Sequence, residues 1–301
     1  MNPDTLKPLL AETFPDIRIR TLTKLGNGKA GEIFLTNGET VFKVPLTSDE
    51  SDSDLRLEYE VLLALHGKVE ITIPKPICIA TLADGRTVLG ESLVPGVQFT
   101  HDMFDSFTQP EKDALFAQMG DIFYQLHTAE IPQIKNAPVY GVKENLEYFY
   151  ENYTDSVKKE LTNAEQAKID EILQNFITAV EKNPPPVTFT HGDVHFWNLN
   201  YDPTAKRICG ILDFGIANYN DPINDIRYFW PKNVAQILVK YPADLGEGLG
   251  ARHLFYNMCN MIDEANGELK RGVVPESVKW LKQLIYQEPL KDHKPVAGFS
   301  I

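Results

Sequence analysis

The sequence predicts an α+β protein with two lobes, in which a β-rich first part is followed by a longer, mostly helical part. Short apolar runs with strand-like alternation crowd the first part, whereas long amphipathic helical patterns follow Val94-Pro95-Gly96. A chain of 301 residues is also long enough for two lobes, at roughly 100–200 residues per domain. We therefore place a first lobe at residues 1–90, an interlobe linker at 91–96 and a second lobe at 97–301.

The first lobe is expected to contain one helix among its strands. Asn37-Gly38 joins two alternating runs and predicts a hairpin, because both turn positions tolerate positive φ. A helix is predicted from Asp54 to His66, where Gly67 ends it. The strands are predicted at residues 17–20, 32–35, 40–44, 77–80 and 88–89.

The second lobe is expected to be built mainly from helices. Thr108 and Glu111 form a capping box, which predicts a helix that runs to about His127. Two short strands are predicted at residues 187–190 and 207–212. Further helices are predicted at residues 143–160, 163–182, 224–240, 247–266 and 275–287.

Two motifs in the second lobe point to function. The first, HGDVHFWN at 191–198, contains Asp193 and Asn198, and the second, ILDFG at 211–215, places Asp213 after an apolar run. Two carboxylates and a carboxamide at this spacing suit metal-dependent phosphoryl transfer. One carboxylate accepts the proton of the attacking hydroxyl, and the other two groups hold Mg²⁺. Asp and Asn also favour turns, so either motif alone would be weak evidence.

A glycine-rich segment of the first lobe, GNGKAG at 26–31, matches the pattern G-x-G-x-x-G. A dinucleotide-binding Rossmann site requires a helix that opens at the third glycine, but here a strand and the Asn37-Gly38 hairpin follow. A Walker A loop is also excluded, because no Lys-Ser or Lys-Thr pair follows Gly31. The segment is therefore predicted to be a turn between two strands. It either covers a triphosphate with its backbone N–H groups or is a plain flexible hairpin.

The order of these motifs resembles that of the protein-kinase-like fold. The H-G-D-x-H-x-x-N form of the first motif resembles the aminoglycoside phosphotransferase superfamily of small-molecule kinases, closest to the 2''-type enzymes, and differs from the H-R-D form of protein kinases. The resemblance implies a bilobal protein-kinase-like fold and transfer of the γ-phosphate of ATP or GTP, with Mg²⁺, to a hydroxyl group. No A-P-E segment is recognisable in the sequence, which argues against a protein substrate.

The resemblance assigns a role to each matching residue of the second lobe. Asp193 is implied as the catalytic base, Asn198 and Asp213 as the magnesium ligands, and His191 as a support of the loop. His195 either stabilises the loop or acts directly.

The resemblance also implies a nucleotide site in the first lobe. Lys43 would contact the α- and β-phosphates and pair with a glutamate of the following helix, although a lysine on the solvent face of an edge strand is the alternative. Glu58 and Glu60 lie about 200° apart on a helix, so only one can face Lys43, and we choose Glu60. The other residues implied for the nucleotide are Gly26, Gly28, Lys29 and Gly31 at the phosphates, and Ser92 and Val94, through their backbone, at the purine.

Two segments after the second motif have open roles. Asp221 and Asp225 belong to a match to D-P-x-x-D and are expected to cap and brace the next helix. Tyr228, Phe229 and Trp230 follow in place of the acidic cluster expected for a polycationic acceptor. These aromatic residues either belong to the core or form an apolar wall for a bulky acceptor such as a macrolide.

The composition narrows the partners. Asp and Glu total 42 against 29 Lys and Arg, a net charge of −13. Such a surface repels nucleic acid and anionic membranes and attracts cationic ligands, although it also simply keeps cytosolic proteins soluble. No apolar run approaches the roughly 20 residues of a membrane span, and the start does not resemble an export signal. The three separate cysteines, Cys78, Cys209 and Cys259, fit buried thiols in a reducing cytoplasm.

The acceptor is expected to be a small cationic molecule, first of all an aminoglycoside antibiotic, and the protein a monomeric resistance enzyme. Carboxylates would pair its ammonium groups, and the candidates are Asp263, Glu264, Glu268, Glu144, Glu147 and Glu151. The same chemistry on a macrolide, a choline-like amine or a sugar metabolite is an alternative. An inactive kinase-like binding module is a third hypothesis. The presence of Lys43, Asp193, Asn198 and Asp213 argues against it.

Overall fold

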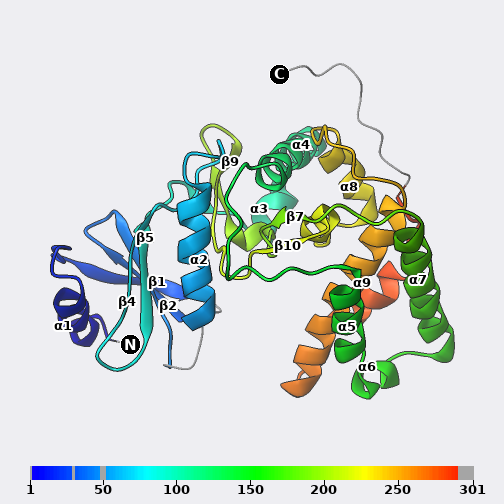
Figure 1. Cartoon of the computed structure of the whole chain (residues 1–301), viewed down its shortest axis with the longest axis horizontal. Coiled ribbons are helices and arrows are strands. Elements are labelled where there is room, and N and C mark those ends of the chain that lie inside the picture. Colours follow the sequence, from blue (N-terminus) through cyan, green and yellow to red (C-terminus); the bar gives the residue numbers. More distant parts are fainter. Residues whose placement is uncertain (1, 29–30, 48–51, 291–301) are drawn as a thin grey trace. The chain divides into compact units, whose positions relative to one another are not determined.

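The computed structural model of the chain describes residues 2–28, 31–47 and 52–290. The chain divides into two compact units, which Figure 1 traces in sequence colours. The first unit comprises residues 1–103, 129–137 and 195–217, and the second comprises residues 104–128, 138–194 and 218–301. Among the described residues, no helix is both long enough and apolar enough to cross a membrane.

The first unit contains a five-stranded antiparallel sheet with the strand order β1-β2-β3-β5-β4. Successive side chains of a strand point to opposite faces. Phe42 and Val44 therefore pack in a core with α1, while Lys43 lies on the other face, against α2. The elements are α1 (Pro3–Thr13), β1 (Leu22–Gly28), β2 (Gly31–Thr36), β3 (Thr40–Val44), α2 (Asp52–Leu65), β4 (Pro76–Thr81) and β5 (Thr87–Ser92).

A three-stranded sheet with the order β6-β8-β9 also belongs to the first unit. It consists of β6 (Val97–Gln98), β8 (Leu199–Asp202) and β9 (Arg207–Ile211), and the short helix η1 (Phe196–Asn198) precedes β8. The backbone N–H of Ile211 donates to the carbonyl of Thr72 at 3.0 Å, which ties this sheet to the segment before β4. The limits of the two units differ from the predicted lobe limits of 1–90, 91–96 and 97–301. The predicted lobe limits therefore stay a prediction.

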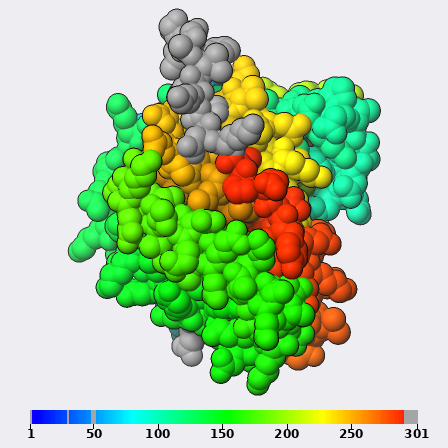
Figure 2. Space-filling view, turned by 90° about the vertical axis from the view of Figure 1, so that its right-hand side faces the viewer, coloured from blue at the N-terminus to red at the C-terminus, as the bar shows by residue number. Residues whose placement is uncertain are grey.

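Helix α9 (Leu249–Lys270) is the central element of the second unit, and its first half is buried on nearly every side. It packs against α5 (Val142–Asn152), α6 (Asp155–Lys159), α7 (Asn163–Lys182) and α10 (Glu276–Leu284). Figure 2 shows the face of this unit that carries α7, in green, and α10, in red. Lys282 of α10 pairs there with Glu165 of α7 at 3.4 Å.

The remaining elements of the second unit include those around residues 191–194, the part of the first motif that belongs to this unit. Helix α4 (Gln109–His127) packs against α8 (Pro231–Leu238), and β7 (Thr188–Thr190) pairs antiparallel with β10 (Asn218–Asn220), which the short helix η2 (Pro222–Ile226) follows. Helix α3 (His101–Ser106) spans the change from the first unit to the second.

The predicted α+β class is confirmed, as are the elements with a strong local signal. Glu111 accepts the N–H of Thr108 at the start of α4, and Gly67, with φ 74°, follows α2. Asn37 and Gly38 both have positive φ, 54° and 79°, in the turn between β2 and β3. The sequence did not predict α1, β1, β6, β8 or β10 as elements.

Three predicted elements are wrong. No strand forms at 17–20, because the side chain of Asn37 bonds the carbonyl of Arg18 at 2.7 Å and the N–H of Arg20 at 3.0 Å. The helix predicted at 143–160 is interrupted at Tyr153 and Thr154, and the extended backbone of Thr154 precedes α6. The helix predicted at 224–240 splits into η2 and α8, because a residue before proline disfavours helical backbone and Pro231 begins α8.

Candidate active site

Lys43, on β3, lies among three carboxylates of the first unit. Its Nζ atom is 2.6 and 2.7 Å from the two carboxylate oxygens of Glu58 and 3.7 Å from both Glu91 and Asp213. Burial alone would lower the pKa of Lys43, but the charges of Glu58, Glu91 and Asp213 outweigh it and raise this pKa above its usual value. The prediction that Lys43 is paired is confirmed.

The choice of Glu60 as the partner of Lys43 is wrong, because Glu58 takes that place. Glu60 instead accepts a hydrogen bond from the side chain of Asn136 at 2.7 Å. Leu55, Glu58 and Leu62 follow one another at helical spacing and are all buried, so Glu58 lies on the inner face of α2. This apolar spacing is the sequence signal that would have selected Glu58.

Glu58 also connects Lys43 to the second motif. Its Oε1 atom accepts the backbone N–H of Phe214 at 3.0 Å. Glu91, a second carboxylate beside Lys43, was not predicted as a site residue from the sequence. Burial raises the pKa of Glu91 to about 8; Lys43 opposes this rise, while the charges of Glu58 and Asp213 add to it. Among the described residues, Oε2 of Glu91 is buried without a hydrogen-bond partner.

The glycine-rich segment covers the end of β1 and the start of β2. Gly28 and Gly31 face each other in antiparallel register. Gly31 has φ 140°, and a Cβ atom at this position would collide with the carbonyl of Val44. Gly26 and Gly28 therefore lie on β1 and Gly31 opens β2, whereas Lys29 lies outside the described residues.

The linker segment is held by backbone contacts of the first unit. The N–H of Ser92 donates to the carbonyl of Lys75 at 2.9 Å, and the N–H of Leu93 donates to the carbonyl of Glu39 at 2.7 Å. The amide of Asn200 donates to the carbonyl of Val94 at 3.0 Å. These bonds fix the backbone of both predicted purine-binding positions, Ser92 and Val94.

Asn198 and Asp213, the predicted magnesium ligands, belong to adjacent backbone in the first unit. The N–H of Leu212 donates to the carbonyl of Asn198 at 2.9 Å. Asp213 has φ 68°, a left-handed conformation that costs a non-glycine residue about 1 kcal/mol or more, and its side chain is 44% exposed. The carboxylate and amide oxygens of this pair fit Mg²⁺, which proteins hold through few side chains together with substrate phosphates.

His195 makes contacts within its own loop. Its Nδ1 atom accepts the N–H of Trp197 at 3.2 Å, and its Nε2 atom lies 3.4 Å from the amide nitrogen of Asn198. The amide oxygen of Asn198 is therefore turned away from His195. Of the two open roles of His195, the structure shows the loop-stabilising one.

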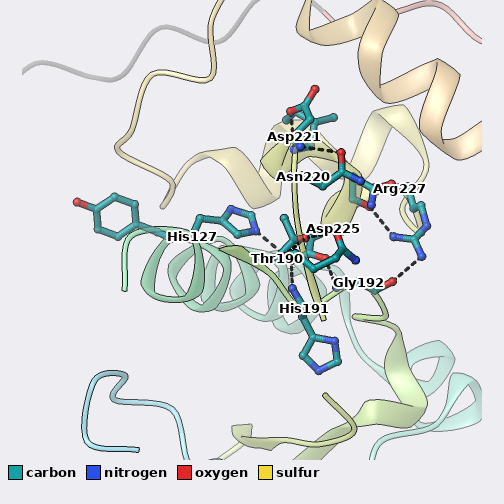
Figure 3. Close-up of polar contacts among 12 residues, drawn as sticks. His127, Thr190, His191, Gly192, Asn220, Asp221, Asp225 and Arg227 are labelled. Carbon is teal, nitrogen blue, oxygen red and sulfur yellow. Dashed lines mark hydrogen bonds and ion pairs between the residues drawn. The ribbon is translucent and has the colours of Figure 1, made fainter. Parts of the chain in front are cut away.

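Asp225 of η2 holds the backbone of the first motif in the second unit, as Figure 3 shows. It is fully buried and accepts the N–H groups of His191 at 2.8 Å and Gly192 at 2.7 Å. Burial alone would raise its pKa, but the hydrogen bond and charge of His127, 3.0 Å away, outweigh burial and lower the pKa. His127 in turn bonds Tyr241 at 3.0 Å. Asp225 thus braces the loop before Asp193, and not the next helix as expected.

The loop also has support from its own residues and from Arg227 and Tyr228. The backbone N–H of Asp193 donates to Nδ1 of His191 at 3.2 Å, which agrees with the implied supporting role of that histidine. Arg227 donates to the carbonyl of Gly192 at 2.6 Å, and the hydroxyl of Tyr228 donates to Oδ1 of Asp193 at 2.6 Å. The contact between Tyr228 and Asp193 was not predicted, because no local pattern relates residues 35 positions apart.

Asp221 caps η2, as expected, by accepting the N–H of Ile223 at 3.0 Å. It also lies 3.3 Å from Arg252 of α9, and both side chains are buried. Burial raises the pKa of Asp221 more than the charge of Arg252 lowers it. This pair joins η2 to the central helix.

Half of the acidic residues proposed for a cationic acceptor have structural partners in the second unit. Glu144 accepts the N–H of Gly141 at 2.9 Å, Glu147 pairs with Lys143 at 3.4 Å, and Glu268 accepts the N–H of Ser277 at 3.0 Å. Asp263 instead faces Tyr148; burial and the charge of Asp263 both raise the pKa of that phenol.

Several solved structures share the fold of the whole chain. A complex of APH(2'')-IIIa with GDP and kanamycin has a TM-score of 0.79 at 22% identity and covers 93% of this chain and 98% of its own. A ternary complex of APH(2'')-IIa with streptomycin and ATP has a TM-score of 0.67 at 20% identity and covers 95% of this chain and 98% of its own.

Curated relatives match a smaller part. The acyl-CoA dehydrogenase family member 11 of Homo sapiens is 22% identical over 192 residues, which are 60% of this chain and 24% of that protein. A probable acyl-CoA dehydrogenase of Arabidopsis thaliana is 22% identical over 57% of this chain and 22% of its own length. The chain thus spans about a quarter of the length of these relatives. Residues 22–256 match the family described as the phosphotransferase enzyme family. The chain therefore belongs to this family.

Proposed function

We propose that this protein is a small-molecule kinase that transfers the γ-phosphate of ATP or GTP to a hydroxyl of an aminoglycoside antibiotic. The observation that carries the proposal is the buried Lys43–Glu58 pair, whose carboxylate also accepts the N–H of Phe214. A lysine and glutamate fixed against the segment that bears a metal-binding carboxylate are required for kinase-type phosphoryl transfer. The GDP and ATP held by the structurally similar enzymes support a nucleotide as the donor.

The first unit would bind the nucleotide. The turn at Gly26, Gly28 and Gly31 would cover the phosphates with its backbone N–H groups, and the ammonium group of Lys43 would contact the α- and β-phosphates. The backbone of Ser92 and Val94 would contact the purine. Because these purine contacts come from backbone, ATP and GTP are both retained as donors.

Asn198 and Asp213 would hold Mg²⁺ through their side-chain oxygens. A cation held by these two residues would supply positive charge against the charge that develops on the phosphates during transfer. The backbone contact between Leu212 and Asn198 keeps the two ligands on neighbouring chain segments, and the bond from Phe214 to Glu58 fixes the residue after Asp213.

Asp193 would orient the acceptor hydroxyl and accept its proton as the oxygen attacks the γ-phosphorus. The proton moves to a carboxylate oxygen of Asp193, the new O–P bond forms, and the bond to the β,γ-bridging oxygen breaks to leave the nucleoside diphosphate. The bonds of Asp225, Arg227 and Tyr228 to residues 191–193 support this role, because they hold the base in one position.

An aminoglycoside is the first candidate acceptor, since the similar structures hold kanamycin and streptomycin. Asp263, which lies beside the phenol of Tyr148, is the acidic candidate that we propose for an ammonium group of such a drug. The net charge of −13 would also attract a polycation.

A panel assay tests the acceptor. The purified protein is incubated with Mg-ATP or Mg-GTP and kanamycin, gentamicin, streptomycin or a macrolide, and nucleoside diphosphate release is followed. We expect turnover with an aminoglycoside, and Asp263→Asn should raise its KM about tenfold, the worth of one lost charge-assisted bond. Glu147→Gln is the matched control, because Glu147 pairs with Lys143. Turnover with the macrolide alone would reject the aminoglycoside and keep the reaction.

The same reaction on a less cationic acceptor is the second candidate. It is favoured by the observation that Glu144, Glu147 and Glu268 have structural partners and are not available as a carboxylate cluster. A kinase-like module that binds nucleotide without turnover remains the third candidate. Magnesium-dependent nucleotide binding with no transfer to any acceptor would support it.

A further inference from the structure

Three of the four residues at positions 225–228 hold the first part of the first motif. Asp225 accepts the N–H groups of His191 and Gly192, Arg227 donates to the carbonyl of Gly192, and Tyr228 donates to the side chain of Asp193. Figure 3 shows Asp225 and Arg227 on either side of Gly192. The segment 225–228 thus holds both the backbone of residues 191–192 and the side chain of Asp193.

Arg227 determines which way the hydroxyl of Tyr228 points. One NH2 group of Arg227 donates to the Tyr228 hydroxyl oxygen at 2.7 Å, and the guanidinium carbon lies 4.4 Å from the centre of the Tyr228 ring. Because the hydroxyl oxygen already accepts from Arg227, its single proton is directed to Oδ1 of Asp193, 2.6 Å away. Arg227 itself is fixed by the carbonyls of Asn224 and Gly192 at 2.8 and 2.6 Å.

We propose that Tyr228, oriented by Arg227, is a positioning residue that holds the carboxylate of Asp193 in the ionised form and in one rotamer for the acceptor hydroxyl. This inference rests on the proposed function, in which Asp193 is the base. It also gives the aromatic and basic residues after Asp225 a role, because Arg227 and Tyr228 contact the loop that carries Asp193.

The chemistry of the three groups agrees with this role. A donor to a carboxylate stabilises its charged form, and a base fixed in one rotamer keeps a near-attack geometry for the incoming hydroxyl. Tyr228 stays protonated over the working pH range, because burial and the charge of Asp193 raise its pKa despite the opposing charge of Arg227. It is therefore a constant donor and does not exchange protons with the acceptor.

Steady-state kinetics on the full chain, with Mg-ATP and kanamycin as the probe acceptor, test the proposal. Tyr228→Phe should lower kcat about 10- to 100-fold, with the KM for ATP within about twofold, because the base is misplaced while the nucleotide site is untouched. The acidic limb of the kcat/KM profile should move to higher pH by about half a unit to one unit, since the carboxylate loses a donor.

Tyr153→Phe is the matched control, because it removes one phenol hydroxyl from the second unit at a position that packs on Phe149. It should leave both kcat and the pH profile as in the wild type. Arg227→Lys is the second variant and keeps the charge but not the paired donors, so it should move the acidic limb in the same direction. An unchanged acidic limb in both Tyr228→Phe and Arg227→Lys would overturn the proposal.

A spectroscopic test does not depend on turnover. In protein labelled with ¹³C at tyrosine Cζ, the Tyr228 resonance should move in Asp193→Ala, whereas the Tyr153 resonance should not. If the Tyr228 resonance moves in Asp193→Ala but the wild-type protein phosphorylates no acceptor, the hydrogen bond is supported and the proposed function is rejected. If the Tyr228 resonance does not move in Asp193→Ala while the wild-type protein phosphorylates an acceptor, the positioning role is rejected and the proposed function is supported.

Discussion

Lys43 lies at a densely charged point of the first unit. Three carboxylates, Glu58, Glu91 and Asp213, lie within 3.7 Å of its single ammonium group. Burial, together with the charges of Glu58 and Asp213, raises the pKa of Glu91 to about 8, although the charge of Lys43 opposes this rise. The excess of negative charge around Lys43 makes the surroundings of Asp213 favourable for a divalent cation, whose charge would balance the remaining carboxylates.

Exchange of Glu58 for Gln tests the corrected partner of Lys43. Glu58→Gln should lower kcat/KM for the nucleotide about 100-fold, because Lys43 loses the charge that fixes it. Glu60→Gln is the matched control on the same helix and should stay within about threefold of the wild type, since Glu60 bonds only the Asn136 side chain in the described structure. Steady-state kinetics with varied nucleotide measure both. A larger loss in Glu60→Gln than in Glu58→Gln would contradict the assignment.

Single residues of the candidate site differ in how well the sequence predicts them. The sequence predicts Asp193, Asn198, Asp213 and Lys43 as site residues because their motifs are short and local. The partner of Lys43 was missed, because the choice followed a sequence likeness and did not use the buried spacing of α2. Tyr228 could not be assigned to Asp193, because their contact depends on how η2 folds against the loop.

At the scale of elements, α4 and α8 approach each other closely at Gly120. A Cβ atom added to Gly120 would collide with the carbonyl of Ile237, a backbone atom that cannot turn away. Gly120→Ala should therefore lower the free energy of unfolding by about 1–3 kcal/mol, the usual cost of overpacking. Urea unfolding followed by circular dichroism measures this difference.

Gly267→Ala is the matched control within a helix. Its new methyl group would meet only the flexible guanidinium of Arg271, at 3.3 Å, so the change should be neutral or stabilise by up to about 1 kcal/mol. Equal unfolding free energies for Gly120→Ala and the wild type would show that α4 and α8 are not in contact at this position.

The elements that the sequence predicted correctly are those with a local stop or start. Thr108 with Glu111 and Thr162 with Glu165 begin α4 and α7, and Gly67 follows α2. The prediction failed where a distant side chain decides the backbone. Residues 17–20 alternate like a strand, but their backbone groups are bonded by the side chain of Asn37.

At the scale of the whole molecule, a buried histidine links stability to pH. His253 of α9 is fully buried, and burial lowers its pKa from 6.5 to about 4. The folded protein therefore holds a neutral ring, while the unfolded chain takes up a proton below about pH 6.5. The resulting stabilisation is complete above that pH and is lost as the pH falls toward 4.

The size of this effect is measurable by urea unfolding. Between pH 7 and pH 5, His253 should account for a loss of about 2 kcal/mol in the free energy of unfolding. His253→Leu should reduce the pH dependence by that amount, whereas His66→Gln, a change at an exposed histidine, should leave it as in the wild type. An identical pH dependence in His253→Leu and the wild type would contradict a neutral buried ring.

We propose that Asp193 promotes transfer of a nucleotide γ-phosphate to a small-molecule hydroxyl. Mass spectrometry of each acceptor after incubation with Mg-ATP or Mg-GTP tests it most directly, with wild type and Asp193→Ala side by side. We predict one added phosphate on an acceptor, abolished by EDTA, and formed about 10²–10⁴ times more slowly by Asp193→Ala, the usual worth of a positioned acid–base group. Phosphorylation at equal rates by both proteins would show that Asp193 is not the base.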